Sequence, residues 1–140
     1  MAAENSSLPE MSSGPSVEFL NYIDTTEALS VTVRQPEQEV LVIHVAGELD
    51  MLTGPPLKEH LNRLLDTRPE RLIVDLSEVV FLGSFGLAVL LGARHAAAKQ
   101  DTTFQLSGTS HRAVARPLQI TGLDQLFEMR PPGELDNPPA

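Results

Sequence analysis

Two neighbouring runs of sequence decide the fold: LIVDL at Leu72–Leu76 and LAVLLGARHAAA at Leu87–Ala98. The first run is short and almost entirely apolar, as expected of a strand that is buried on both faces of a sheet. The second run is longer, rich in alanine and apolar on most sides, which is typical of a deeply buried helix. A buried strand followed by a buried helix predicts a crossover unit of a mostly parallel sheet.

The sequence before this unit repeats the same order of strand and helix. The run VLVIHVA at Val40–Ala46 is nearly continuously apolar and rich in β-branched residues, so we expect a central strand there. The next segment, Gly47–Pro56, contains Gly, Asp, Thr and two prolines. After it, leucines recur at the spacing of an amphipathic helix, at Leu57, Leu61, Leu64 and Leu65. Pro55 and Pro56 suit the first turn of this helix.

Shorter elements complete the alternation. Leu29–Arg34 and Phe104–Leu106 predict two further strands, and His111–Thr121 predicts a third helix, which Pro117 is expected to kink. Strands that alternate with helices of 10 to 15 residues indicate crossover connections between parallel strands. The predicted fold class is therefore α/β.

The ends of the chain differ in composition from the part between them. Residues 1–27 contain five acidic residues and no Lys or Arg, so we expect a partly disordered leader. The sequence leaves open whether a strand or short helix forms around Val17–Ile23. Residues 130–140 hold four of the eleven prolines and predict a tail. The expected domain spans residues 28–129. Near its end, Gly122 predicts a left-handed helix cap, and Leu123–Met129 predicts a last helical turn or two.

Length and composition limit the classes of function. The 140 residues fit one domain, and 41% hydrophobic and 21% charged residues are close to globular averages. The net charge of −9 would repel a phosphate backbone, so we expect no nucleic-acid partner. No apolar run reaches the ~18 residues of a membrane span, and the N-terminus lacks the pattern of a secretory signal. We expect a cytoplasmic protein without membrane attachment.

The patterns typical of enzymes are weak in this sequence. Glu48 and Asp50 form a close carboxylate pair after the central strand, but no motif ties a second acid or base to them. Ser84 lies between glycines, yet Leu82 stands where a nucleophile elbow needs Gly. The sequence also lacks a P-loop and a dinucleotide fingerprint. We expect a protein that is not an enzyme and needs no cofactor.

A metal site is also not indicated. The sequence has no cysteine, so it can form no thiolate site and no disulfide. Its four histidines, His44, His60, His95 and His111, are not at the spacing of a zinc site. We expect no metal to be needed.

Ser84 lies directly before the helix that is predicted to start near Phe85 or Gly86. Its hydroxyl has two alternative roles. As a helix N-cap it would accept a hydrogen bond from a backbone N–H group. As a kinase substrate it would carry a phosphate close to free N–H groups and the positive end of the helix dipole.

The run DLSEVVFLGSFGL at Asp75–Leu87 resembles the signature of STAS domains, specifically of bacterial anti-sigma factor antagonists. GELD at Gly47–Asp50 and TGLDQLF at Thr121–Phe127 also match, in order and at the family spacing. The resemblance covers about residues 28–129. It implies a central sheet of four to five strands, mostly parallel and mixed at one edge, flanked by about four helices.

The resemblance also implies a function. Family members bind an anti-sigma factor, usually a serine kinase, and so release a sigma factor. The kinase switches them off by phosphorylating one serine, and a phosphatase restores them. Ser84 aligns with that serine, although the family commonly has Asp where this chain has Gly83 and a second Ser or Thr where it has Phe85.

From this resemblance we expect Ser84 to be the phosphoacceptor. The expected docking surface for the anti-sigma factor is formed by Glu48, Leu49, Asp50, Gly83, Ser84 and Phe85. The alternative is a constitutive STAS scaffold or small-ligand-binding module in which Ser84 is only a helix cap.

Overall fold

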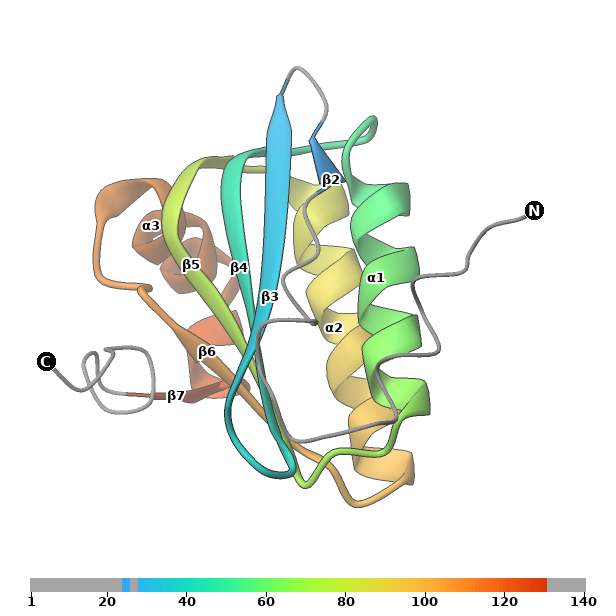
Figure 1. Ribbon diagram of the computed structural model, residues 1–140. Coiled ribbons are helices and arrows are strands. Elements are labelled where there is room, and N and C mark those ends of the chain that lie inside the picture. The colour runs from blue at the N-terminus through green and yellow to red at the C-terminus, as the bar shows by residue number, and fades with distance from the viewer. Residues whose placement is uncertain (1–23, 26–27, 131–140) are drawn as a thin grey trace, which may run out of the picture.

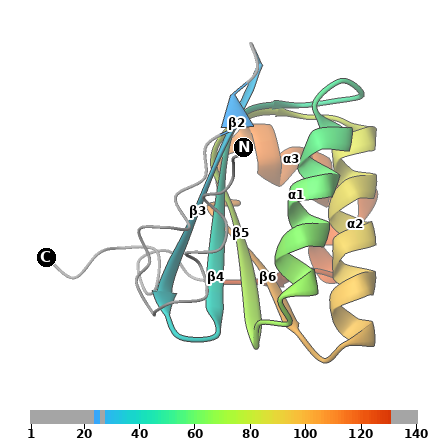
Figure 2. The same ribbon diagram turned by 45° about the vertical axis from the view of Figure 1, so that its right-hand side comes forward.

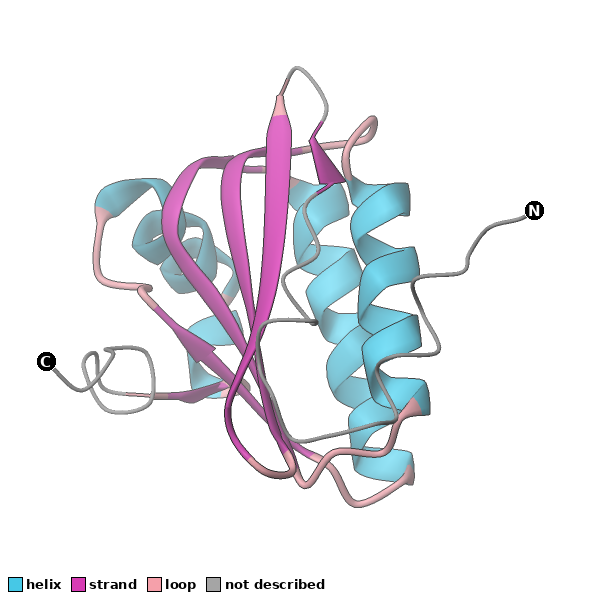
Figure 3. Cartoon of the chain, in the orientation of Figure 1, coloured by secondary structure: helices cyan, strands magenta, loops and turns pink. Residues whose placement is uncertain are grey.

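The computed structural model describes residues 24–25 and 28–130. They form an α/β domain with one six-stranded sheet in the order β2-β3-β4-β5-β6-β7 (Figures 1 and 3). Along the chain the elements are β2 (Asp24–Thr25), β3 (Leu29–Glu37), β4 (Val40–Leu49), α1 (Gly54–Asp66), β5 (Arg71–Leu82), α2 (Ser84–Lys99), β6 (Thr103–Ser107), α3 (Arg112–Thr121), the 3₁₀ helix η3 (Leu123–Gln125) and β7 (Glu128–Met129).

The sheet is parallel from β4 to β7 and antiparallel at the β2–β3–β4 edge. Each crossover from β4 onward moves one strand further in the same direction, and right-handed crossovers of this kind place their helices on one face. Figure 2 shows α1, α2 and α3 on the same side of the sheet. The mixed edge and the mostly parallel centre confirm the predicted fold class, while the described residues form six strands where four to five were expected.

The main core lies between this helical layer and the sheet. Its fully buried side chains include Ile43 and Leu72 from the strands, Leu57 and Leu90 from the helices α1 and α2, and Val114 from α3. A smaller cluster of Val40, Val42 and Ile73 is buried on the opposite face of the sheet. The central strands are therefore apolar on both faces, which explains their nearly continuous apolar sequences.

Strand β5 is longer than the sequence predicts, because it continues from Leu76 to Leu82. Its second half pairs with the end of β4, and the register slips by one residue between His44 and Ala46 and again between Gly47 and Glu48. The two bulges add residues to β5 relative to β4. They break the alternation of apolar and polar residues from which a strand is recognised in a sequence.

The C-terminal elements correct one prediction. Gly122 has the expected left-handed conformation (φ 76°), but the segment after it is only partly helical. It forms η3 and then β7, whose Glu128 and Met129 pair in parallel with Gln105 and Leu106 of β6. A two-residue edge strand exists only because β6 offers free backbone groups, and this is a tertiary effect.

Within the described residues, the sheet already includes a strand from the segment expected to be the leader, because β2 pairs with Ser30 and Val31 of β3. The expected element around Val17–Ile23 and the tail after Arg130 lie outside the described residues. In the described part of the chain, no helix is both long and apolar enough to cross a membrane.

Candidate functional site

The two halves of the expected docking surface meet where β4 and β5 end. Glu48 lies opposite Phe81 and Leu49 lies opposite Leu82 in the parallel register. The Gly83 N–H group then donates a hydrogen bond to the Leu49 carbonyl oxygen (2.9 Å). The loop after β4 and the start of α2 are thereby held side by side.

Asp50 organises the loop after β4. Its Oδ1 atom accepts hydrogen bonds from the backbone N–H groups of Leu52 (2.9 Å) and Thr53 (3.1 Å). These bonds to the charged form lower the pKa of the Asp50 carboxyl group. This carboxylate therefore shapes the loop on which neighbouring side chains are displayed.

Thr53 fixes the same loop from inside. Its side chain is buried, and its hydroxyl donates to the Glu48 carbonyl oxygen (2.7 Å) and accepts from the Asp50 N–H group (2.9 Å). A hydroxyl bonded in this way has an internal role and does not face a partner. Glu48 itself has an exposed side chain.

Leu49 corrects the expected docking surface. Its side chain is fully buried in the main core and cannot contact a partner. A side chain at Gly86 would come within 2.9 Å of the Leu49 Cβ atom. Leu49 therefore positions the start of α2, and the surface of the loop is formed by other residues.

Ser84 is the first residue of α2 and its side chain is exposed. The N-cap is Gly83, in extended conformation, and no side chain caps the helix. The proposal that Ser84 is the N-cap is therefore wrong. The first helical bond runs from the Leu87 N–H group to the Gly83 carbonyl oxygen (3.0 Å). The N–H groups of residues 84–86 have no acceptor among the described residues.

The two residues in which the signature departs from the family have packing partners. Phe85, half-exposed, packs its ring against Gly54 at the start of α1, where an added Cβ atom would lie 2.4 Å from the ring. A Cβ atom at Gly83 would already lie 3.0 Å from the Phe81 ring, which makes the small residue a good fit. The aromatic rings and the glycines therefore form two matched pairs around Ser84.

Sequence reasoning missed four exposed apolar side chains near Ser84. Met51 (73% exposed) and Leu52 (83% exposed) project from the Asp50 loop, and Val80 and Phe81 project from the end of β5. The signal was present, because apolar residues in a Gly- and Pro-containing loop follow no strand or helix period. We call the exposed residues Met51, Leu52, Phe81, Ser84 and Phe85 the Ser84 surface.

None of the histidines belongs to a metal site among the described residues, where no group of three or more His, Asp or Glu side chains could hold an ion. His44 lies between Asp75 and Arg34: its Nδ1 atom is 2.7 Å from Asp75 Oδ2, and its Nε2 atom accepts from Arg34 Nε (3.0 Å). Because a guanidinium can only donate, this arrangement selects the tautomer with the proton on Nδ1. His111 contacts the Val79 carbonyl oxygen (2.8 Å) and anchors the start of α3 to β5.

Comparison with known proteins identifies a family. The sequence model of the STAS domain matches residues 30–133. The anti-sigma-F factor antagonist RsfB of Mycobacterium tuberculosis is 32% identical over 104 residues, which are 74% of this chain and 82% of that protein. The anti-sigma-B factor antagonist of Listeria monocytogenes is 32% identical over 102 residues, or 73% of this chain and 89% of that protein.

A solved structure agrees with these matches. The crystal structure of an anti-sigma factor antagonist from Mycobacterium paratuberculosis superposes with a TM-score of 0.70 and 33% sequence identity. The superposition covers 81% of this chain and 93% of that one. Sequence and structure therefore point to the same family, and the family model covers the described residues from 30 onward.

Proposed function

The chain belongs to the STAS domain family, and from this premise we propose that it is an anti-sigma factor antagonist. In this role it binds an anti-sigma factor of the serine-kinase type in the cytoplasm and releases a sigma factor. It acts by binding and is not an enzyme. The observation that carries the proposal is the exposed Ser84 at the start of α2, with exposed Phe81 and Phe85 close to it in the chain and exposed Met51 and Leu52 on the adjoining loop.

The Ser84 surface has the composition of a protein contact. Apolar side chains cluster on it, although single exposed apolar residues are usually scattered over a surface. The aromatic rings of Phe81 and Phe85 are of the type that contributes most at interfaces, and the loop that presents Met51 and Leu52 is held by the Asp50 and Thr53 hydrogen bonds. A rigid apolar surface loses little conformational entropy when a partner binds.

Phosphorylation of Ser84 would switch this surface off. A phosphate there would lie next to the unbonded N–H groups of residues 84–86, so the helix could accept it without unfolding. The same phosphate would bring a charge of about −1.5 to −2 into an apolar contact. A 100-fold weaker complex requires about 2.7 kcal/mol, which desolvation of such a charge can supply. A phosphatase would reverse the switch.

The alternative is a constitutive scaffold or ligand-binding module without phosphorylation, in which Ser84 was expected to be only a helix cap. No side-chain cap is found on α2, so the cap role is not supported, and the labelling experiment below distinguishes the two functions. Replacing Ser84 by Ala should therefore change the free energy of unfolding by less than about 0.5 kcal/mol, as for a surface substitution that breaks no bond.

The test is phosphate incorporation from ATP by the serine-kinase anti-sigma factors of the organism that encodes this chain. Wild type should be labelled and Ser84→Ala should not. Ser77→Ala is the matched control, because Ser77 is also exposed, and it should be labelled like wild type. Thr53 is buried and is not an alternative acceptor.

Titration calorimetry completes the experiment. Ser84→Ala should bind the anti-sigma factor as wild type does, and Ser84→Asp should bind more weakly, since one carboxylate imitates a phosphate only in part. If Ser84→Ala were labelled as strongly as wild type, the assignment of Ser84 as the phosphoacceptor would be refuted. Absence of binding to every anti-sigma factor would refute the proposed function.

A further inference from the structure

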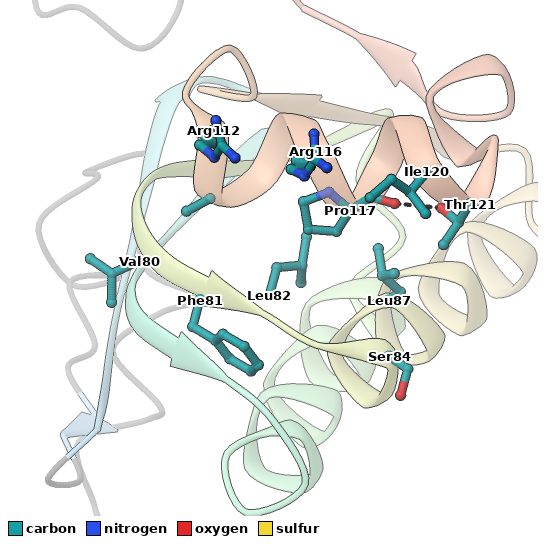
Figure 4. Close-up of a pocket in the computed structure, with 11 residues that line it drawn as sticks. Val80, Phe81, Leu82, Ser84, Leu87, Arg112, Arg116, Pro117, Ile120 and Thr121 are labelled. Atoms are coloured by element: carbon teal, nitrogen blue, oxygen red, sulfur yellow. Dashed lines mark hydrogen bonds between the residues drawn. The ribbon is translucent and has the colours of Figure 1, made fainter.

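A groove of about 620 Å³ runs between the end of β5 and helix α3 (Figure 4). Its apolar lining comes from Val80, Phe81 and Leu82 of β5, Leu87 of α2, and Pro117 and Ile120 of α3. Val80 and Ile120 are 67% and 70% exposed. Exposed aliphatic side chains that line a shared groove indicate a contact surface.

Two arginines give the groove a positive charge. Arg112 and Arg116 line it from one face of α3, one helical turn apart. Neither guanidinium has a hydrogen bond or ion pair to a described side chain, and no carboxylate is among the lining residues. The chain has a net charge of −9, so this groove is a positively charged region on an acidic protein.

The position of α3 is fixed, so the groove does not depend on a partner for its shape. Val114 and Leu118 are buried in the main core beneath the helix. His111 holds its first turn to the Val79 carbonyl oxygen (2.8 Å). The arginines and Ile120 therefore lie on a rigid element with its apolar side already buried.

We propose that this groove binds a segment of the anti-sigma factor in which apolar residues are flanked by carboxylates. The inference rests on the proposed function, because it assigns the same partner a second contact. Ser84 is itself a lining residue, so the groove is continuous with the Ser84 surface. The groove is open on one side and would leave a small molecule half-exposed, which favours a protein segment lying along it.

Phosphorylation of Ser84 would also weaken binding of the acidic segment in the groove. A phosphate on Ser84 would stand at the edge of the groove that receives the partner's carboxylates. Like charges at such a contact oppose binding. The arginines, by contrast, would supply the attraction that makes association faster at low salt.

The test compares two double variants of equal charge change for binding to the anti-sigma factor. Arg112→Gln with Arg116→Gln removes the groove charges, and Arg63→Gln with Lys99→Gln removes two exposed charges near the C-terminal ends of α1 and α2. We expect the groove variant to bind at least tenfold more weakly and with a smaller salt dependence. The control should change affinity less than threefold. Circular dichroism and thermal unfolding should show both variants folded.

A second measurement identifies the occupant. Arg116→Lys keeps the charge and adds an amine, which a carbodiimide can join to a carboxylate within contact distance. Mass spectrometry should find Lys at this position linked to an acidic and apolar segment of the anti-sigma factor, and Arg63→Lys should give no such link. A link to this chain's own carboxylates or to a second copy would overturn the proposal.

The two proposals fail in different ways. Wild-type affinity of the groove variant, together with weakened binding of Ser84→Asp, would overturn the groove and leave the proposed function standing. Failure of wild type to bind any anti-sigma factor would overturn both.

Discussion

Asp75 is a buried carboxylate whose partners can be tested by pH. Burial alone would raise its pKa, but hydrogen bonds from His44 and from the Ser77 N–H group (2.9 Å) outweigh burial and lower the pKa from 3.8 to about 2. The charged form therefore stabilises the folded state. The pKa difference corresponds to roughly 2 to 3 kcal/mol at neutral pH.

We predict that this contribution is present above about pH 5 and is lost as the pH falls toward 2, because the folded pKa lies below the unfolded one. Urea denaturation from pH 7 to pH 2 should show that Asp75→Asn is less stable than wild type at pH 7 and loses less stability on acidification. Asp66→Asn, at an exposed position, should follow the wild-type profile. Parallel profiles for wild type and Asp75→Asn would contradict the assignment.

Ser84 and Thr53 show how two hydroxyl residues in similar settings can have different roles. Both hydroxyls lie in strand-to-helix loops, the setting in which a cap is expected. The Thr53 hydroxyl donates to the Glu48 carbonyl oxygen and accepts from the Asp50 N–H group, whereas Ser84 makes no bond that caps its helix. No described residue bonds the Ser84 hydroxyl, so it is the one available for modification.

Helix α2 is the element on which the fold depends most. Leu90 is fully buried against the sheet, and Leu91 is only partly buried. We predict that Leu90→Ala lowers the free energy of unfolding by about 2 to 5 kcal/mol, through lost burial and the cavity left behind. Leu91→Ala should cost less than half as much. Denaturant titration of both variants is the measurement, and equal losses would show that the burial assignment of this helix is wrong.

Substitutions at the two glycines of α2 distinguish the effect of close packing from the effect of helix propensity. A Cβ atom at Gly86 would lie 2.9 Å from Leu49 Cβ and 3.2 Å from the Leu49 carbonyl oxygen, whereas one at Gly92 would meet nothing within 4 Å. We predict that Gly86→Ala destabilises the domain by about 1 to 3 kcal/mol. Gly92→Ala should stabilise it by about 0.5 to 1 kcal/mol, since alanine is the better helix former. If thermal unfolding ranked the two variants in the reverse order, the proposed close packing of Gly86 against Leu49 would be wrong.

For the molecule as a whole, the main core runs from Leu29 to Phe127. We predict that a chain without residues 1–16 and 131–140 still unfolds cooperatively, because those segments offer almost no periodic apolar face in their sequence. Calorimetry of the shortened and full-length chains should give one transition each. Deletion of β2 and part of β3, residues 24–31, is the matched control and should abolish that transition. If the shortened chain showed no cooperative transition, residues 1–16 or 131–140 would have to contribute to the core.

The sequence by itself determined the order of strands and helices, the α/β class and the place of Ser84 beside a helix start. Each follows from periods of two and 3.6 residues over long runs, such as Val40–Ala46 and Leu87–Ala98, which local chemistry imposes. The family signature lies mainly in the segments that adjoin these runs, at Gly47–Asp50 and Asp75–Leu87. For these features no knowledge of distant contacts was needed.

Only the tertiary structure decided which loop side chains face solvent, where the last strand forms and where the groove lies. Leu49 is buried while Met51 and Leu52, two and three residues later, are exposed, because the β4–β5 register and the packing of α2 turn the chain between them. Strand β7 exists because β6 has a free edge, and the groove exists because α3 returns to the end of β5. Burial and pairing at such places are set by residues more than 20 positions away, such as the β6 partners of β7, and no local period in the sequence records them.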